Sequence, residues 1–164
     1  MTEKILSMID LSEPEIWSIQ ANRLKGLSDI SQMICGQLVE QGGMVAFGES
    51  KLLHLWSHKL LLVTSEIDPS HLTQLENNLT DVSHGYSFLQ IEGDSTLEFI
   101  NAHVPLDLEN EGFQTLRAAK TQFENYSVIF WWDQPDTVQL LIDRSYTKSF
   151  REYSDTLIHL WKNL

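Results

Sequence analysis

A short segment in the second half of the chain, Ser127–Trp132, carries five large apolar residues in a row after its serine. Successive side chains of a β-strand point to opposite faces, so a strand of this composition is apolar on both faces. Such a strand has to be covered on both sides, which predicts a central position in a layered fold. The polar segment Asp133–Asp136 contains a proline and predicts the turn that follows. Hydrophobic residues make up 42% of the 164-residue chain, enough to build a core of this kind.

The first half of the chain alternates between strand and helix patterns. Glu15–Gln20 alternates with period two and predicts a strand. A stripe of apolar residues at spacings of three and four predicts a helix over 27–39 with one apolar face, made of Leu27, Ile30, Ile34 and Leu38. Ser28 or Asp29 is its candidate cap, and Gly42-Gly43 is its expected stop. The elements expected next are strands at Met44–Phe47, Lys51–Trp56 and Lys59–Thr64, and a helix opened by Asp68-Pro69 with Leu72, Leu75 and Leu79 buried.

The second half repeats this order of elements. A strand is predicted over 84–92, followed by a helix over 95–103 in which Ser95 and Glu98 match the capping-box pattern. Further strands are predicted near 115–122, 126–132 and 137–142. The last and most regular helix pattern is Thr147–Leu164, with a predicted buried face of Tyr146, Phe150, Tyr153, Leu157, Leu160, Trp161 and Leu164.

The two halves predict an α+β fold of two tightly joined ferredoxin-like split βαβ units with antiparallel sheets. We expect a flexible lead-in at 1–14, a βαββα unit at 15–80 and a βαβββα unit at 81–164. The whole is expected to form one compact domain.

The charge of the chain argues against several classes of partner. Its 23 acidic and 11 basic residues give a net charge of −12, without a Lys/Arg stripe to offset it. Such a chain repels phosphate backbones and anionic membranes, so neither nucleic acid nor a membrane is an expected partner. A single cysteine and six histidines without metal-motif spacing predict no metal site. The apolar runs are too short to span a bilayer, and a cytoplasmic location is expected.

The central part of the chain carries a family resemblance. Asp81–His84 reads Asp-Val-Ser-His, Glu92–Asp94 reads Glu-Gly-Asp, and Asp107-Leu108 follows the predicted helix at 95–103. This order is similar to the glycine-cleavage T-protein (aminomethyltransferase), in which Asp-Val-Ser-His leads into a strand that ends in Glu-Gly-Pro-Asp. There, too, a helix and an Asp-Leu turn come next.

A second resemblance covers roughly residues 15–164. The hairpin segment Leu55–Leu62, the segment Leu140–Tyr146 and a closing helix that contains a tryptophan stand in the order found in the gamma subunit of heterotetrameric sarcosine oxidase. The T-protein has a catalytic aspartate in a Gly-Gly-Val-Ile-Asp-like stretch, whereas the matching strand here, Asn125–Trp132, has no carboxylate. The resemblance therefore implies the aminomethyltransferase-like fold and a partner complex, not aminomethyl transfer.

The polar residues of the motifs have two interpretations. Asp81, Ser83 and His84 could form a catalytic or ligand-binding turn, but three residues in one turn do not easily adopt the geometry of a catalytic triad, which favours turn stabilisation. Asp143 or Ser145 is a candidate helix cap. The other family-motif residues are Gly93, Asp94, Asp107 and Arg144.

By resemblance, this chain is expected to be a non-catalytic gamma-type subunit of a complex that oxidatively demethylates sarcosine in one-carbon metabolism. FAD, FMN, NAD, zinc and tetrahydrofolate would then belong to the flavin-bearing and other subunits, and none is expected on this chain. A free-standing tetrahydrofolate-binding or aminomethyltransferase-like protein is the first alternative, and a self-associating regulatory domain is the second. The residues expected at a partner interface are Trp131, Trp132, Arg144 and Trp161.

Overall fold

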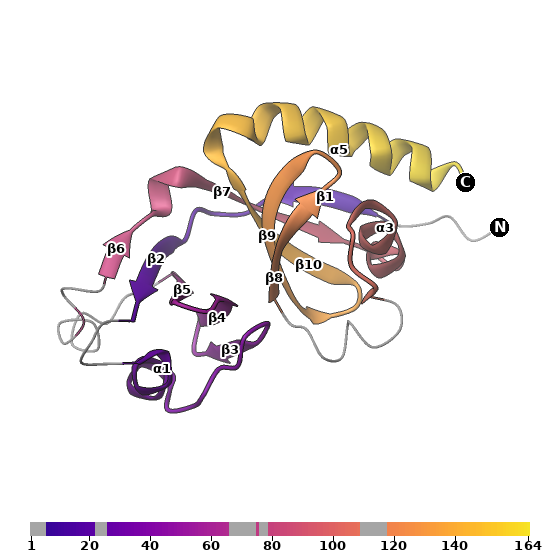
Figure 1. The fold of residues 1–164 in the computed structure, drawn as a ribbon. Coiled ribbons are helices and arrows are strands. Elements are labelled where there is room, and N and C mark those ends of the chain that lie inside the picture. Colours follow the sequence, from indigo (N-terminus) through magenta and orange to yellow (C-terminus); the bar gives the residue numbers. More distant parts are fainter. Residues whose placement is uncertain (1–5, 22–25, 66–74, 76–78, 109–117) are drawn as a thin grey trace. The chain divides into compact units, whose positions relative to one another are not determined.

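The computed structural model describes residues 6–21, 26–65, 75, 79–108 and 118–164. The chain forms two compact units, one of Glu13–His84 and one of Met1–Ser12 together with Gly85–Leu164 (Figure 1). Each unit contains a five-stranded sheet in which all neighbouring strands are antiparallel. The predicted α+β class with antiparallel sheets is confirmed.

The unit of residues 13–84 is built on a sheet with the strand order β3-β4-β5-β2-β6. Its helix packs on one face, where Ile30 and Ile34 meet Leu52, Leu60 and Leu62 of the central strands. Burial of these aliphatic side chains is the main force that holds helix and sheet together. The elements are β2 (Glu15–Gln20), α1 (Leu27–Cys35), β3 (Met44–Phe47), β4 (Ser50–Trp56), β5 (Lys59–Thr64) and β6 (Leu79–Asp81).

Helix α1 is shorter than predicted. It ends at Gly36, whose φ of 70° lies in the left-handed region and whose N–H donates to the carbonyl of Gln32. Glycine adopts that conformation without steric cost, which makes it a common helix stop. Leu38, expected on the buried face, is 64% exposed and lies beyond the helix. The N-cap is Gly26, and Asp29 reaches back to accept its N–H at 3.3 Å.

The three strands predicted in the middle of this unit are present, and β4 and β5 form the expected hairpin. Lys59 places its ammonium group 4.1 Å from the ring centre of Trp56 beside the turn. The helix predicted from Asp68 falls mostly outside the described residues. Leu79, assigned to that helix, lies in strand β6 instead, where it is opposite Ile19 of β2.

The second unit is built on a sheet with the order β1-β7-β10-β9-β8. Part of the predicted lead-in belongs to this sheet, because Ser7–Asp10 pairs with β7 along its length. Leu6 and Met8 of this segment are buried in the core of the unit. The elements are β1 (Ser7–Asp10), β7 (Tyr86–Glu92), α3 (Thr96–His103), β8 (Ala118–Phe123), β9 (Tyr126–Gln134), β10 (Thr137–Asp143), η4 (Arg144–Tyr146) and α5 (Thr147–Lys162). The short 3-10 turn η2 (Ser83–Gly85) spans the point at which the chain passes from the other unit into this one.

Strand β9 is buried on both faces, as its composition predicted. Val128, Phe130 and Trp132 belong to the core cluster that includes residues of α3 and α5. Ile129 and Trp131, which alternate with them, are 2% and 1% exposed. The strand lies between β8 and β10, so it is also hydrogen-bonded along both edges.

The start of α3 differs from the predicted capping box. Ser95 is the N-cap residue, but its side chain makes no cap hydrogen bond to the helix. The Ser95 hydroxyl is instead buried and accepts the indole N–H of Trp161 at 3.2 Å. A tertiary hydrogen bond therefore replaces the local one that the sequence pattern indicated.

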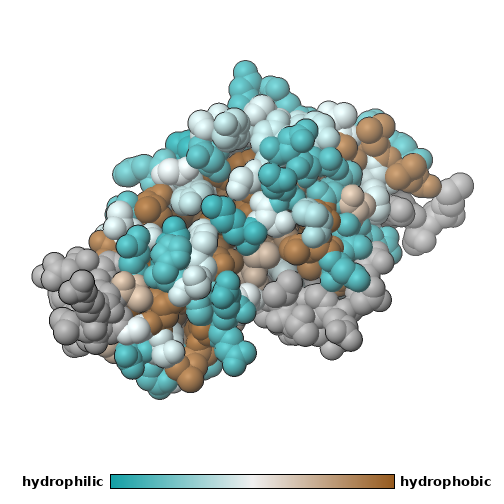
Figure 2. Space-filling model, in the orientation of Figure 1, coloured by the Kyte–Doolittle hydropathy of each residue, from teal (hydrophilic) through white to brown (hydrophobic). Residues whose placement is uncertain are grey.

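Helix α5 lies along one face of this sheet (Figure 1), but with a different side inward than predicted. Phe150, Ser154 and Ile158 are its buried residues, and Leu157 and Trp161 pack beside them. The expected buried face is wrong at four positions, which are instead exposed: Tyr146 (57%), Tyr153 (36%), Leu160 (57%) and Leu164 (86%). Figure 2 shows the resulting hydrophobic surface at the C-terminal end of this helix.

Candidate functional site

The Asp81–His84 motif forms a self-contained turn. One carboxylate oxygen of Asp81 accepts the N–H of Ser83 at 2.9 Å and its hydroxyl at 2.6 Å. The Ser83 hydroxyl also accepts the backbone N–H of Ile16 at 2.8 Å, which ties the turn to strand β2. The hydrogen bond from the Ser83 hydroxyl is the main cause that lowers the pKa of Asp81 below its ordinary value of 3.8. His84 is exposed in η2, and its charge contributes a smaller lowering.

A second Asp-x-Ser turn occurs where β10 leads into α5. Asp143 accepts the N–H of Ser145 at 3.0 Å and its hydroxyl at 2.6 Å, and these bonds lower the pKa of Asp143. Arg144 is exposed and donates to the backbone carbonyl of Tyr86 at 2.7 Å. The pKa of Tyr86 is raised, first by burial and then by the negative charge of Asp143. Asp143 is therefore the cap of η4, and Arg144 anchors the turn to β7.

The remaining motif residues also lie at turns. Gly93 has a φ of 140° and donates its N–H to the carbonyl of Asp136 at 2.9 Å. The hydroxyl of Thr96 donates to the same carbonyl at 3.1 Å. Asp94 and Asp107 are exposed on the loops before and after α3. These residues are spread over several turns rather than brought together around one reaction centre.

Two of the predicted interface residues are not on the surface. Trp131 and Trp132 are each 1% exposed, so neither side chain is available to a docking partner in this conformation. Trp131 stacks on Phe88 with ring centres 5.6 Å apart and donates its indole N–H to Gln139 at 2.7 Å. Trp161 is half-buried and bonded to Ser95. Their size makes tryptophans frequent in interfaces, but here the same property places them in the core.

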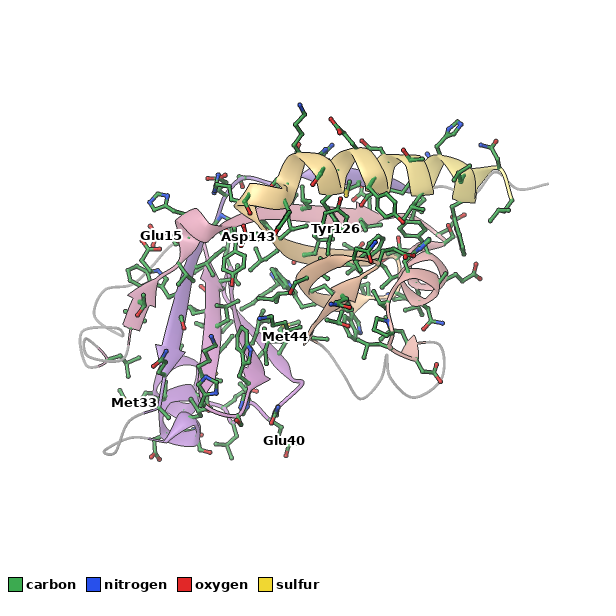
Figure 3. All side chains as sticks on the ribbon, turned by 45° about the horizontal axis from the view of Figure 1, so that its top comes forward. Glu15, Met33, Glu40, Met44, Tyr126 and Asp143 are labelled. Atoms are coloured by element: carbon green, nitrogen blue, oxygen red, sulfur yellow. The ribbon has the colours of Figure 1, made fainter. Side chains whose placement is uncertain are left out.

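One hollow among the described residues is a site that the sequence patterns did not indicate. It has a volume of about 550 Å³, within the range of ligand-binding cavities. The end of the β8–β9 hairpin forms one side, and the end of η4 with the first two turns of α5 forms the other. Figure 3 shows Tyr126, from β9, beneath this helix. The lining residues are Gln122, Asn125, Tyr126, Ser127, Tyr146, Ser149 and Tyr153.

Three tyrosine rings shape this tyrosine hollow. The ring centre of Tyr126 lies 6.3 Å from that of Tyr146 and 6.0 Å from that of Tyr153. Tyr126 is itself held edge-on against Phe150, at 5.3 Å, in the core of the unit. Tyr126 is therefore held in place by the core and forms the floor of the hollow. The exposed rings of Tyr146, at the end of η4, and Tyr153, in α5, form its side walls.

The sequence contained a signal for this hollow, but the pattern was ambiguous. Tyr146, Ser149 and Tyr153 are spaced by three and four residues, which places them on one side of a helix. The predicted stripe joined the two tyrosines to Phe150 and did not include Ser154, which the structure places in the buried face. The helix therefore has two stripes of residues at helical spacing. Phe150, Ser154 and Ile158 form the buried stripe, and the two tyrosines belong to the exposed stripe.

Two kinds of feature are absent from the described residues. Within them, no group of three or more His, Cys, Asp or Glu side chains is arranged to hold a metal ion. None of their helices is both long and apolar enough to cross a membrane.

Comparison with known proteins gives structural matches only. No protein-family model matches the sequence, and no curated protein matches it either. A chain of heterotetrameric sarcosine oxidase from Corynebacterium sp. U-96, solved in complex with pyrrole 2-carboxylate, matches 90% of this chain and 80% of its own length. Its TM-score is 0.74 at 20% sequence identity.

A second match is the glycine cleavage system aminomethyltransferase T from Bartonella henselae. It covers 92% of this chain with a TM-score of 0.63 at 10% identity. This chain spans less than half, 45%, of that protein. The expected aminomethyltransferase-like fold is confirmed by these two matches.

Proposed function

We propose that this chain is a non-catalytic, gamma-type subunit of a cytoplasmic complex of the sarcosine oxidase kind, which oxidatively demethylates sarcosine. Its role would be to stabilise an assembly whose flavin-bearing subunits carry out the chemistry. FAD, FMN, NAD, zinc and tetrahydrofolate would be bound by those other subunits.

The observation that carries this proposal is the nearly mutual match to a chain of heterotetrameric sarcosine oxidase. The alignment leaves out only a tenth of this chain and a fifth of the other, so the two are alike over almost their full lengths. The two Asp-x-Ser turns add support, because their carboxylates and hydroxyls are occupied by the hydrogen bonds that hold the turns. An aspartate that accepts the amide and hydroxyl of the serine two residues on forms a common local turn, which accounts for these residues without a catalytic role.

Co-purification tests the proposal. The tagged chain is co-expressed with candidate flavin-bearing subunits, and the eluate is examined for flavin absorbance and for a single peak in size-exclusion chromatography. We expect stoichiometric co-elution at micromolar concentration. A chain that stays separate from every flavin-bearing subunit under these conditions would contradict the proposal.

Arg144 gives a residue-level test of the interface. Arg144→Ala is expected to weaken the association, because an exposed arginine is a common interface anchor. Lys148→Ala, four residues along and also exposed, is the matched control. Both variants are first checked for an unchanged melting temperature, since Arg144 also bonds to Tyr86.

The match to aminomethyltransferase T supports a second candidate, a tetrahydrofolate-binding module. A folate bound near any of the five tryptophans would quench their fluorescence. Saturable quenching by tetrahydrofolate, but not by an unrelated pteridine-free anion, would favour this candidate. A flat titration would leave the subunit proposal as the better supported.

A further inference from the structure

The tyrosine hollow combines a rigid floor with two exposed side walls. Tyr126 is fixed by its edge-on packing against Phe150, whereas Tyr146 and Tyr153 are 57% and 36% exposed. Exposed aromatic rings beside a preformed cavity are costly to leave in water and are typical of binding surfaces. The rings of Tyr146 and Tyr153 both approach Tyr126, so aromatic surface gathers at this hollow.

The lining of the hollow predicts a ligand without net charge. Each of the seven lining side chains is neutral, although 21% of the residues in the chain are charged. A charged group placed in such a site would lose hydration without gaining a counter-charge. A cation is further disfavoured, because the hollow lies on the first two turns of α5, where the helix dipole is positive.

The same lining favours a ligand rich in hydrogen-bond acceptors. The amides of Gln122 and Asn125 and the phenols of the tyrosines can all donate. Ser149 has a small side chain, and its hydroxyl already donates to the carbonyl of Tyr146 at 3.1 Å. It therefore fills little of the space between the tyrosine rings. A proline-rich segment in the polyproline II conformation has apolar pyrrolidine rings and backbone carbonyls without internal partners.

The spacing of Tyr146 and Tyr153 along the helix is similar to the length of one polyproline II turn. Tyr146, the last residue of η4 and the N-cap residue of α5, and Tyr153 are seven residues apart, which corresponds to about 10 Å along the helix axis. One turn of a polyproline II helix advances about 9 Å over three residues. Ser149, the small residue between the two tyrosines in the sequence, lines the hollow with them, and their ring centres lie 6.3 Å and 6.0 Å from that of Tyr126.

We propose that the tyrosine hollow binds a proline-rich segment of a partner protein in the polyproline II conformation. Prolines one turn apart pack against Tyr146 and Tyr153, and the carbonyls between them accept hydrogen bonds from Asn125 and Gln122. Recognition by aromatic-lined grooves of this type relies on the preformed, extended shape of the ligand. This site goes beyond the proposed subunit role and involves residues that the Asp-x-Ser turns do not use.

The test is a titration of the full chain with an eight-residue oligoproline peptide, followed by calorimetry and by NMR shifts of the tyrosine rings. We expect saturable binding, with shifts confined to the hollow, and no binding of a Gly/Ser peptide of equal length. Tyr146→Leu and Tyr153→Leu should each weaken the affinity by about tenfold, the effect of removing an aromatic anchor. Leu160→Ala, exposed on the same helix but outside the lining, is the matched control and should bind normally.

Three results would overturn the proposal. The first is the absence of saturable oligoproline binding, and the second is binding that both tyrosine variants leave unchanged. The third is saturable binding of a neutral oligosaccharide such as cellotetraose in place of the peptide, because it would assign the stacking rings to a sugar. Co-purification with flavin-bearing subunits is measured separately, so the subunit proposal can fail or stand independently of this one.

Discussion

The two sides of helix α5 contain similar residues in very different surroundings. On one side Phe150 and Ile158 are 0% and 6% exposed and belong to the core of the unit. On the other side Tyr153 and Leu160 are 36% and 57% exposed. An apolar stripe at helical spacing is therefore not by itself evidence of burial. The comparison separates residues that stabilise the fold from residues that are free to act in recognition, and measurements on variants can test this separation.

The largest expected loss of stability comes from a substitution on the buried side of α5. Phe150 packs edge-on against Phe123, with ring centres 5.5 Å apart, and also supports Tyr126. Phe150→Ala should lower the free energy of unfolding by about 3–5 kcal/mol, through lost burial and the cavity left behind. Urea denaturation measures this loss. Leu160→Ala is the matched control and should change stability by less than about 0.5 kcal/mol. Equal losses in the two variants would contradict the assignment of the faces.

A smaller loss is expected at the end of the buried side. Trp161→Phe keeps an aromatic ring against Phe99 but removes the indole N–H that Ser95 accepts. The expected loss is about 1–2 kcal/mol, from one buried hydrogen bond and some lost contact area. A double-mutant cycle with Ser95→Ala isolates the hydrogen bond. Additive effects of the two changes would show that the bond contributes nothing to stability.

Ser154 offers a gain in stability on the same side. Its hydroxyl is buried in the core face of α5 and has no hydrogen-bond partner among the described residues. Ser154→Ala removes this unpaired polar group and introduces a better helix former, so it should raise stability by about 1 kcal/mol. The readout is the midpoint of urea unfolding. A loss of stability would mean that the hydroxyl is bonded in solution.

These expectations also show where the sequence patterns were sufficient. Period-two alternation and turn residues located β2 to β5, β7, β9 and β10, and the doubly apolar composition of β9 correctly predicted its burial on both faces. Local periodicity is enough to locate such strands, because alternate residues of a strand lie on opposite faces of the sheet and reflect how each face is buried. The side of α5 that turns inward was wrong, since a single buried serine shifts the apparent stripe by about one position.

Other features depend on contacts that are distant in sequence. Strand β1 is recognisable only through its pairing with β7, about 80 residues away. The Ser95 hydroxyl makes no cap hydrogen bond to α3 and instead accepts the indole N–H of Trp161. The Asp81 and Asp143 motifs were visible as patterns, and the local chemistry expected for them matches the turns observed. The tyrosine hollow was not visible, because it arises where the β8–β9 hairpin meets the start of α5. The spacing of residues along one element does not reveal a site that is formed by two elements distant in sequence.

The cap before α5 gives a pH-dependent prediction. The Ser145 hydroxyl and amide lower the pKa of Asp143 from 3.8, so the folded state favours the ionised carboxylate. This contribution to stability is present above the unfolded pKa and is lost as the pH falls through the lower folded value. Asp143→Asn should therefore be less stable than the wild type at pH 7, with a difference that shrinks below about pH 4. Urea midpoints at pH 7, 5 and 3 measure it.

Ser145→Ala provides the control for this prediction. It removes the hydrogen bond that is the first cause of the lowered pKa of Asp143 and leaves the carboxylate in place. The pH dependence of its stability should therefore resemble that of Asp143→Asn. A difference from the wild type that stays constant between pH 7 and pH 3 would show that the charge of Asp143 is not involved.

The smallest expected effect on stability lies on the open side of α5, where it is most informative. The double variant Tyr146→Ser with Tyr153→Ser removes two exposed rings but leaves Tyr126 and its contact with Phe150 in place. Its free energy of unfolding should stay within about 1 kcal/mol of the wild type, because exposed side chains contribute little to folding. Oligoproline binding should nevertheless be lost. Destabilisation as large as that of Phe150→Ala would make the rings part of the core, whereas unchanged stability with lost binding would assign this side of the helix to recognition.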